Sequence, residues 1–274
     1  MEANKRSEAA MADKQRIVVK VGTSTLTHPT GRTNFRRVEA LVRVLSDLQN
    51  QGLAMTLVTS GAIGVGVGKL GLDGRPSDTP GKQAAATVGQ CELMYMYDKF
   101  FAEYGQKVGQ LLITRGDMED PARHRNLLAA FDRLFDWGVI PIINENDAVA
   151  VEEIVYGDND ALSAHVAVLV SAEKLIILTD IDGLYDKNPA LHPDARLIER
   201  VETITPEIHA LARGAGSAMG TGGMETKLKA AQLACQEGID THIINGNTPE
   251  NIHRLLAGEQ VGSWFKAGKV CSEI

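Results

Sequence analysis

The feature that most constrains the fold is an alternation along the chain. Short, continuously apolar runs take turns with longer segments of helical periodicity. Because the runs are apolar throughout, they predict strands buried on both faces, as in a parallel sheet. The alternation therefore predicts an α/β fold with a mostly parallel central sheet and helices on both of its faces. The predicted strands are 16–21, 54–59, 107–113, 139–144, 174–179 and 241–244, and the predicted helices are 34–51, 82–104, 121–137, 160–171 and 224–236.

Composition narrows the classes of function. The 274 residues are 44% hydrophobic, which is enough for a substantial core, and the formal net charge is −7. Basic blocks interleaved with aromatic residues do not occur, which argues against nucleic-acid binding. An anionic ligand must therefore be held by local positive groups rather than by the global field.

Further signals concern the compartment and the domain boundaries. Three scattered cysteines, Cys91, Cys235 and Cys271, predict reduced thiols in a cytoplasmic protein. Membrane-spanning apolar runs and a signal-peptide core are both lacking, so no membrane association is expected. We expect residues 1–15 to be a disordered lead-in, 16–266 to be a single domain and 267–274 to be a loose tail.

Four polar segments lie where predicted strands end or predicted helices begin. Ligands bind beyond the carboxyl ends of parallel strands, and these segments offer bare N–H groups, hydroxyls and lysines there. Such groups suit a polyanionic phosphate chain. Two of the segments carry lysines, which favours stabilisation of charge on a transferring phosphoryl group. The segments are 18–24, 58–62, 157–160 and 220–227.

The two lysines stand in unfavourable local settings. Lys20 interrupts an apolar strand, which is costly unless the ammonium is paired or faces a polar cleft. Lys227 falls in the first turn of a predicted helix, where it opposes the helix dipole unless an anion lies there. The alternative in both cases is a lysine that reaches solvent. Neither a P-loop nor a GxGxxG fingerprint follows the first strand.

The polar residues around the other segments also have two interpretations. Ser60 and Asp160 can be helix N-caps alone, and 144–147 can be an ordinary turn. Two acid–amide clusters so close in sequence, 144–147 and 158–160, favour a shared site over turns alone. Thr179 and Asp180 end a strand and either recognise a nucleoside or form a loop.

These motifs together resemble the glutamate 5-kinases of the amino acid kinase superfamily, over about 16–265. The first and last motifs are shared loosely across the superfamily. The segment Asn-Glu-Asn-Asp at 144–147, combined with Gly-Asp-Asn-Asp at 157–160, is more specific to the glutamate 5-kinases. The resemblance implies a three-layer αβα sandwich, the amino acid kinase fold. The motifs are 19–24, 58–63, 108–112, 144–149, 157–160, 178–180, 183–185 and 220–227.

The resemblance also implies an activity and roles for residues. The activity is ATP-dependent phosphorylation of the glutamate side-chain carboxylate, the first step of proline biosynthesis, with Mg²⁺ carried on the ATP phosphates and not by a protein metal site. Lys20 and Lys227 would flank the phosphates, and Asp160 would hold both lysines. Asp147 would pair with the substrate ammonium, and Asn159 with the Ser60–Gly61 region would donate to its α-carboxylate. The implied glutamate contacts are Ser60, Gly61, Asn144, Asp147, Asp158 and Asn159. The implied ATP contacts are Lys20, Thr179, Asp180, Thr221, Gly222, Gly223, Met224, Glu225, Thr226 and Lys227.

The same resemblance implies partners for the protein, and two alternative functions remain open. It implies proline as a feedback inhibitor, glutamyl phosphate reductase as a partner and a homo-oligomer. A hairpin at 152–157 is expected to fold over the site, and no room is left for the C-terminal PUA domain that many members carry. One rival is a kinase for an N-acetylated amino acid, aspartate, carbamate or a nucleoside monophosphate. The other is a nucleotide- or ligand-sensing module that has lost catalysis. Asp147 argues against an N-acyl substrate, and the two lysines with Asp160 argue against lost catalysis.

Overall fold

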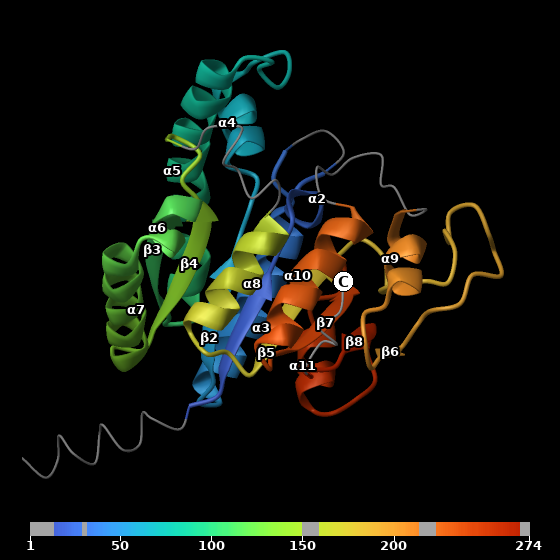
Figure 1. Ribbon diagram of the computed structural model, residues 1–274. Coiled ribbons are helices and arrows are strands. Elements are labelled where there is room, and N and C mark those ends of the chain that lie inside the picture. The colour runs from blue at the N-terminus through green and yellow to red at the C-terminus, as the bar shows by residue number, and fades with distance from the viewer. Residues whose placement is uncertain (1–13, 29–31, 150–158, 214–222, 269–274) are drawn as a thin grey trace, which may run out of the picture.

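A single eight-stranded sheet forms the centre of the molecule (Figure 1). The structure, a computed structural model, describes residues 14–28, 32–149, 159–213 and 223–268. The strand order is β3-β4-β2-β1-β5-β7-β8-β6, and every neighbouring pair is parallel except β7 and β8. The strands are β1 (Arg16–Lys20), β2 (Ala54–Val58), β3 (Lys107–Ile113), β4 (Val139–Glu145), β5 (Lys174–Thr179), β6 (Arg200–Val201), β7 (Asp240–Asn245) and β8 (Ser263–Phe265).

Helices cover both faces of this sheet and complete three layers (Figure 1). On one face, α7, α8, α9 and α10 share a core with alternate residues of the strands, such as Val18 and Ile177. On the other, α3, α5 and α11 pack on the intervening residues, such as Val19 and Ile176. The αβα sandwich and the mostly parallel sheet are thus confirmed. The helices are α2 (Thr23–Leu26), α3 (Phe35–Asn50), α4 (Ala62–Leu70), α5 (Thr79–Glu103), α6 (Arg115–Glu119), α7 (Pro121–Asp136), α8 (Asn159–Leu169), α9 (Pro206–Arg213), α10 (Met224–Gln236) and α11 (Asn251–Leu256).

The strand register places the polar segments at one edge of the sheet. Lys20, the last residue of β1, lies opposite Val58 of β2 and Ile177 of β5. Because these strands are parallel, their carboxyl ends and the loops that follow meet at this edge. All six predicted strands are present. The structure adds β6 and β8, which have two and three residues and are too short to give a continuous apolar run.

The pair α4 and α5 packs backbone against backbone and rises together from the body of the molecule (Figure 1). A Cβ atom on Gly66 would lie 1.8 Å from the carbonyl oxygen of Ala85, and one on Gly89 would lie 1.7 Å from that of Ala62. Only glycine fits such an approach. The packing fixes the start of α4, and with it the turn that follows β2.

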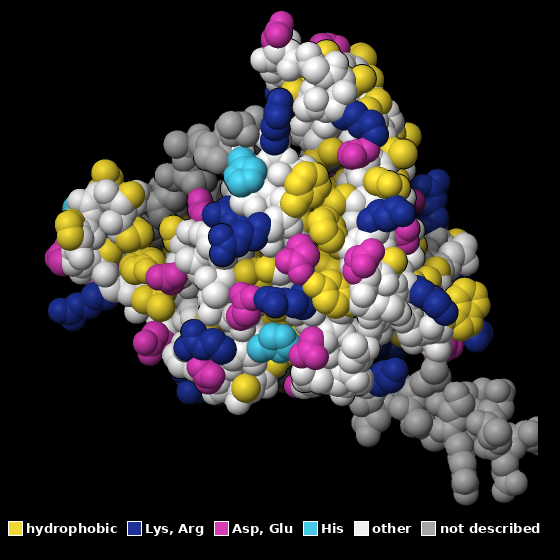
Figure 2. All heavy atoms as spheres, turned by 180° about the vertical axis from the view of Figure 1, so that it is seen from behind, with side chains coloured by type: hydrophobic (Ala, Val, Ile, Leu, Met, Phe, Trp, Pro, Cys, Tyr) yellow, Lys and Arg dark blue, Asp and Glu magenta, His cyan; other side chains and the backbone are white. Residues whose placement is uncertain are grey.

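The surface mixes charges of both signs. In Figure 2, Lys and Arg side chains alternate with Asp and Glu over the face seen from behind, and hydrophobic side chains gather along the edge formed by α4 and α5. The exposed large hydrophobic residues include Leu70, Leu72 and Tyr95 in this region. Across the described ranges, every helix is too short or too polar to cross a bilayer.

Candidate active site

A buried charged cluster lies at the carboxyl edge of the sheet. Asp160, in the first turn of α8, is fully buried, and its Oδ1 lies 2.6 Å from Nζ of Lys20. Its Oδ2 lies 3.1 Å from Nζ of Lys227 on α10. The lysines are 3% and 6% exposed, so both ammonium groups are held inside the protein. The cluster joins β1, α8 and α10 and carries one net positive charge in a region of low dielectric constant, where charge interactions are strong.

The N-terminus of α10 adds donors beside this cluster. The hydroxyl of Thr226 lies 2.9 Å from Oδ2 of Asp160 and 2.8 Å from the carbonyl oxygen of Gly223. Gly223 is the N-cap and supplies no side-chain acceptor for the first N–H groups of the helix. Those groups and the positive end of the helix dipole favour an anion at this end. The side chain of Met224 is buried in the core and that of Glu225 pairs with Lys229 at 3.0 Å, so these two residues offer backbone N–H groups.

A chain of neutral amides lies next to the charged cluster. Nδ2 of Asn144 donates to Oε1 of Gln90 at 2.7 Å, and Nδ2 of Asn159 donates to Oδ1 of Asn144 at 2.8 Å. Nδ2 of Asn159 also donates to the carbonyl oxygen of Thr59. Both amide hydrogens of Asn159 are thus engaged within the protein. This differs from the expectation that Asn159 donates to a substrate carboxylate, because the amide has only its oxygen left for a ligand.

The turn after β2 is tied to the end of β1. Oγ of Ser60 donates to the carbonyl oxygen of Val21 at 3.2 Å, and Oγ1 of Thr23 donates to Oγ of Ser60 at 3.4 Å. Gly61, with φ of +97°, occupies the left-handed conformation that glycine tolerates best, and is itself the N-cap of α4. Ser60 is therefore not the N-cap, and its hydroxyl lies between the two strand ends.

Asp147 lies in the turn that follows β4 and is half-buried. Burial raises the pKa of its carboxyl, and the positive charge of Arg75 opposes that rise. A partly desolvated carboxylate of this kind is suited to pair with a cation. Asp158, Thr221 and Gly222 lie outside the described residues, as do the predicted hairpin at 152–157 and the predicted lead-in up to residue 13.

The ends of β5 and β7 form the remaining side of the site. Oγ1 of Thr179 donates to Oδ1 of Asp180 at 3.2 Å, and Asp180 is exposed. After β7, Nδ2 of Asn247 donates to the carbonyl oxygen of Asp180 at 3.4 Å, and Nδ2 of Asn245 donates to Oδ1 of Asp182 at 2.8 Å. These loops leave polar groups accessible, as a nucleoside site requires.

Sequence reasoning missed three polar residues of this region: Gln90, Asn245 and Asn247. Two signals were available for them. Asn245 and Asn247 follow an apolar strand, which is where ligand-binding loops lie. Gln90 is a polar residue on the buried face of a helix, three and seven residues before the buried Leu93 and Tyr97.

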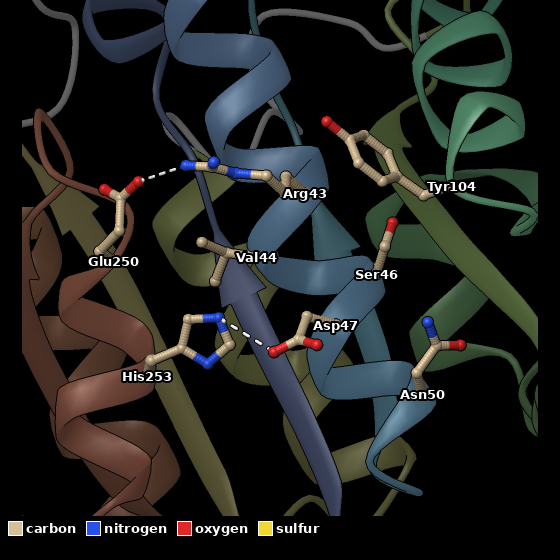
Figure 3. A pocket seen from close by; sticks show the side chains of 8 residues that line it. All are labelled: Arg43, Val44, Ser46, Asp47, Asn50, Tyr104, Glu250 and His253. Carbon is tan, nitrogen blue, oxygen red and sulfur yellow. Dashed lines mark hydrogen bonds and ion pairs between the residues drawn. The ribbon is translucent and has the colours of Figure 1, made fainter.

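A separate hollow of about 430 Å³ lies between α3, the end of α5 and α11 (Figure 3). Arg43 and Glu250 form an ion pair across it at 2.8 Å, and His253 lies 3.5 Å from Asp47. These side chains are largely exposed, so each pair contributes about 1 kcal/mol or less to stability. None of the predicted site residues lines this hollow, so it lies apart from the candidate active site.

Comparison with known proteins identifies the class. The family model for the amino acid kinase family matches residues 15–245, and the chain belongs to this family. "Glutamate 5-kinase" of Clostridium acetobutylicum is 54% identical over 258 residues, which are 94% of this chain and 97% of that protein. "Glutamate 5-kinase" of Caldanaerobacter subterraneus subsp. tengcongensis is 52% identical over 250 residues, 91% of this chain and 67% of that longer protein. The resemblance to the glutamate 5-kinases in particular is therefore confirmed.

Solved structures agree on the fold. Carbamate kinase from Giardia lamblia superposes with a TM-score of 0.68 at 17% identity, covering 94% of this chain and all of that one (100%). Isopentenyl phosphate kinase from T. acidophilum gives a TM-score of 0.64 at 20% identity, with 92% of this chain and 100% of that one covered. At such identities the likeness establishes the fold alone, and the substrate must be argued from the site.

Proposed function

We propose that the protein transfers the γ-phosphoryl group of ATP to the side-chain carboxylate of L-glutamate and forms glutamyl 5-phosphate. The observation that carries this proposal is the buried cluster of Lys20, Asp160 and Lys227. Two fixed ammonium groups suit the charge that develops on a phosphoryl group in transfer. The relatives named glutamate 5-kinase support glutamate as the acceptor.

The chemistry requires no general base. A lone pair of the ionised glutamate side-chain carboxylate forms the new O–P bond, while the bond between the γ-phosphorus and the bridging oxygen breaks and leaves ADP. The protein contributes positioning and charge neutralisation. Lys20 and Lys227 would contact the phosphate oxygens, Asp160 would keep both ammonium groups at fixed positions, and the α10 N-terminus would donate backbone N–H groups.

The residues present fit a nucleotide that brings its own Mg²⁺. Both oxygens of Asp160 contact ammonium groups, and these two positive charges beside the carboxylate disfavour a divalent cation there. Mg²⁺ tends to be bound by substrate phosphates and water with few protein ligands. When bound, it neutralises charge on the phosphates. We infer that ATP occupies the side formed by Thr179, Asp180 and 223–227, with Thr221 and Gly222 contributing as the resemblance implies, within a single domain at 16–266.

Glutamate is proposed to lie toward the amide chain. Asp147 would pair with the α-ammonium, and the N–H groups of the Ser60–Gly61 turn would face the α-carboxylate. Asn144 and Asp158 would border the same pocket. The oxygen of Asn159 would face the ammonium, because its amide hydrogens are engaged with Thr59 and Asn144.

Coupled release of ADP tests the proposal. Rates would be measured with glutamate, aspartate and N-acetylglutamate at equal ATP and Mg²⁺. We expect glutamate to give the highest kcat/KM, because aspartate is too short and N-acetylglutamate lacks the ammonium. A higher value for another acceptor would indicate a different kinase of this family. ATP binding without ADP release from any acceptor would indicate a sensing module.

We further propose proline as an inhibitor that competes with glutamate, since it carries the same α-carboxylate and α-ammonium and lacks the side-chain acceptor. Initial rates at several proline and glutamate concentrations check this. Inhibition that saturating glutamate does not relieve would place proline elsewhere.

A cytoplasmic location, a homo-oligomer and glutamyl phosphate reductase as a consumer of the product belong to the same proposal. The exposed side chains of Leu70, Leu72 and Tyr95 favour self-association.

A further inference from the structure

Gln90 is a buried polar residue of α5 that none of the site motifs contains. Its side chain is 9% exposed and lies on the buried face of the helix with Leu93 and Tyr97. Its Oε1 accepts from Asn144, and its Nε2 is buried without an acceptor among the described residues. Buried donors are normally paired, so an unpaired one indicates that something else determines the orientation of this amide.

Two backbone groups fix the orientation of the whole amide chain. The N–H of Glu145 donates to one side-chain atom of Asn144 at 2.9 Å, which must therefore be the oxygen. The other atom of Asn144 is then Nδ2, and Gln90 must meet it with Oε1. At the far end, the carbonyl oxygen of Thr59 accepts from Asn159, so the contacting atom there is Nδ2. Each amide has one donor end and one acceptor end.

The result is a defined polarity at the pocket. Nδ2 of Asn159 contacts both Thr59 and Asn144, and no described residue donates to its Oδ1. The atom that Asn159 has left for a ligand is an acceptor, as is Asp147 on the neighbouring turn. An ammonium fits two acceptors, whereas a carboxylate would be repelled by them.

Gln90 is the side chain that secures this polarity from outside the pocket. If its oxygen were removed, Nδ2 of Asn144 would be left buried without an acceptor, and of these two contacts only the N–H of Glu145 would still hold that side chain. Asn159, which donates to Asn144, would then be held less firmly with its oxygen toward the pocket. An unmade buried hydrogen bond is costly, so the chain of three amides moves as a unit.

We propose that Gln90 is a positioning residue that holds Asn144, and through it Asn159, with an oxygen toward the α-ammonium of the substrate. This inference rests on the proposed phosphorylation of glutamate. It makes Gln90 a determinant of substrate choice without contact with the substrate, since selection for an amino group would depend on an amide that Gln90 helps to hold in place.

The experiment compares Gln90→Met, which removes the acceptor, with Gln90→Glu, which keeps an oxygen toward Asn144. Gln236→Met, the same change at an exposed position near the end of α10, is the matched control. For each variant, kcat and the KM values for glutamate and ATP are measured. The rate with glutarate, which is glutamate without its amino group, is measured alongside.

For Gln90→Met we expect the KM for glutamate to rise about tenfold, because a directed polar contact in the pocket is lost. The KM for ATP should stay within about twofold, and the preference for glutamate over glutarate should fall by a similar factor of about ten. Gln90→Glu should recover most of the glutamate KM. Gln236→Met should behave as the wild type.

Several outcomes would overturn the role of Gln90. One is an unchanged glutamate KM in a folded Gln90→Met protein. Another is a parallel rise in the KM for glutamate and for ATP, which a merely structural role would give. If Gln90→Met does not fold, Gln90→Asn, which withdraws the acceptor by one methylene, must show the same selective rise. Wild-type protein that does not phosphorylate glutamate would overturn the proposed function itself, which separates the two failures.

Discussion

Two buried clusters meet at the start of α8 and differ in what they contribute. Asp160 belongs to a charged cluster with Lys20 and Lys227, whereas its neighbour Asn159 belongs to a neutral chain with Asn144 and Gln90. The charged cluster offers an excess positive charge, which attracts phosphate with little dependence on angle. The amide chain offers no charge but a fixed direction. In the proposed function, phosphate affinity and substrate choice would therefore depend on adjacent residues that act by different physical means.

The largest expected effect comes from neutralising the centre of the charged cluster. Asp160→Asn leaves two buried ammonium groups without their carboxylate, and we expect a loss of about 3–5 kcal/mol in the free energy of unfolding. Urea unfolding measures it. Asp132→Asn is the control, because that carboxylate pairs with Arg16 at 3.0 Å but is 48% exposed, and its loss should cost less than about 1 kcal/mol. Equal losses in both variants would contradict the buried character of the cluster.

Lys227→Ala should affect catalysis more than folding. Asp160 keeps Lys20 at 2.6 Å in this variant, but one preorganised donor to the transferring group is gone, which typically lowers turnover by ~10²–10³. Turnover at saturating ATP and glutamate is the measurement. Lys229→Ala, a 64% exposed lysine of the same helix, should leave turnover close to that of the wild type. Wild-type turnover in Lys227→Ala would remove this lysine from the catalytic set.

His242 of β7 differs from both clusters, because the described residues give its side chain neither a buried ion pair nor a place in a chain of hydrogen-bonded amides. It is 7% exposed, stacks on Trp264 with ring centroids 6.0 Å apart, and its Nδ1 has no hydrogen-bond partner among the described residues. Burial lowers its pKa to about 4, with Lys174 adding to the shift and Asp240 opposing it. The ordinary pKa is 6.5.

Between pH 6.5 and 4, His242 is therefore protonated in the unfolded chain but neutral in the folded protein. The free energy of unfolding should fall as the pH falls through this window, by up to about 1.4 kcal/mol per pH unit and roughly 3 kcal/mol in all. Unfolding curves at several pH values, compared with those of His242→Phe, measure the difference. A wild-type profile parallel to that of the variant would show that His242 does not titrate in this range.

Asp147→Asn should act on glutamate alone. An ammonium that loses its partner in a half-buried site costs about 2 kcal/mol, or about 30-fold in KM. The KM for ATP should hardly change. The wild-type KM for glutamate should also rise as the pH falls, starting at a higher pH than for an ordinary aspartate because burial raises the pKa of Asp147. The variant should lack this dependence, and equal rises in both KM values would assign the ammonium to another residue.

The fold was predictable because its signals are local. Continuous apolar runs gave six strands, and a 3.6-residue period gave five helices, each with boundaries close to those observed. The edge of the sheet formed by β6 and β8 could not be predicted, because strands of two and three residues are too short to show a periodic pattern. Their pairing depends on residues more than 60 positions apart, Arg200 and Trp264.

The candidate site was predictable where charge is costly. A lysine in an apolar strand needs a charged partner, so Lys20 could be recognised as a candidate from the sequence alone. In the structure this partner is Asp160. Gln90 gave no such signal, since a single polar residue on a helix does not reveal which residue it meets. Its partner, Asn144, is 54 positions away. The direction of the Asn159 amide likewise depends on a backbone carbonyl 100 positions away.

The adjacency of Asn159 and Asp160 has a consequence for how such chains can change in length. Successive side chains of an α-helix point about 100° apart, which lets one terminus serve both clusters. Inserting a single residue between them would turn one side chain away from its partners while leaving the other in place. The contacts of both clusters therefore require Asn159 and Asp160 to remain adjacent in the sequence.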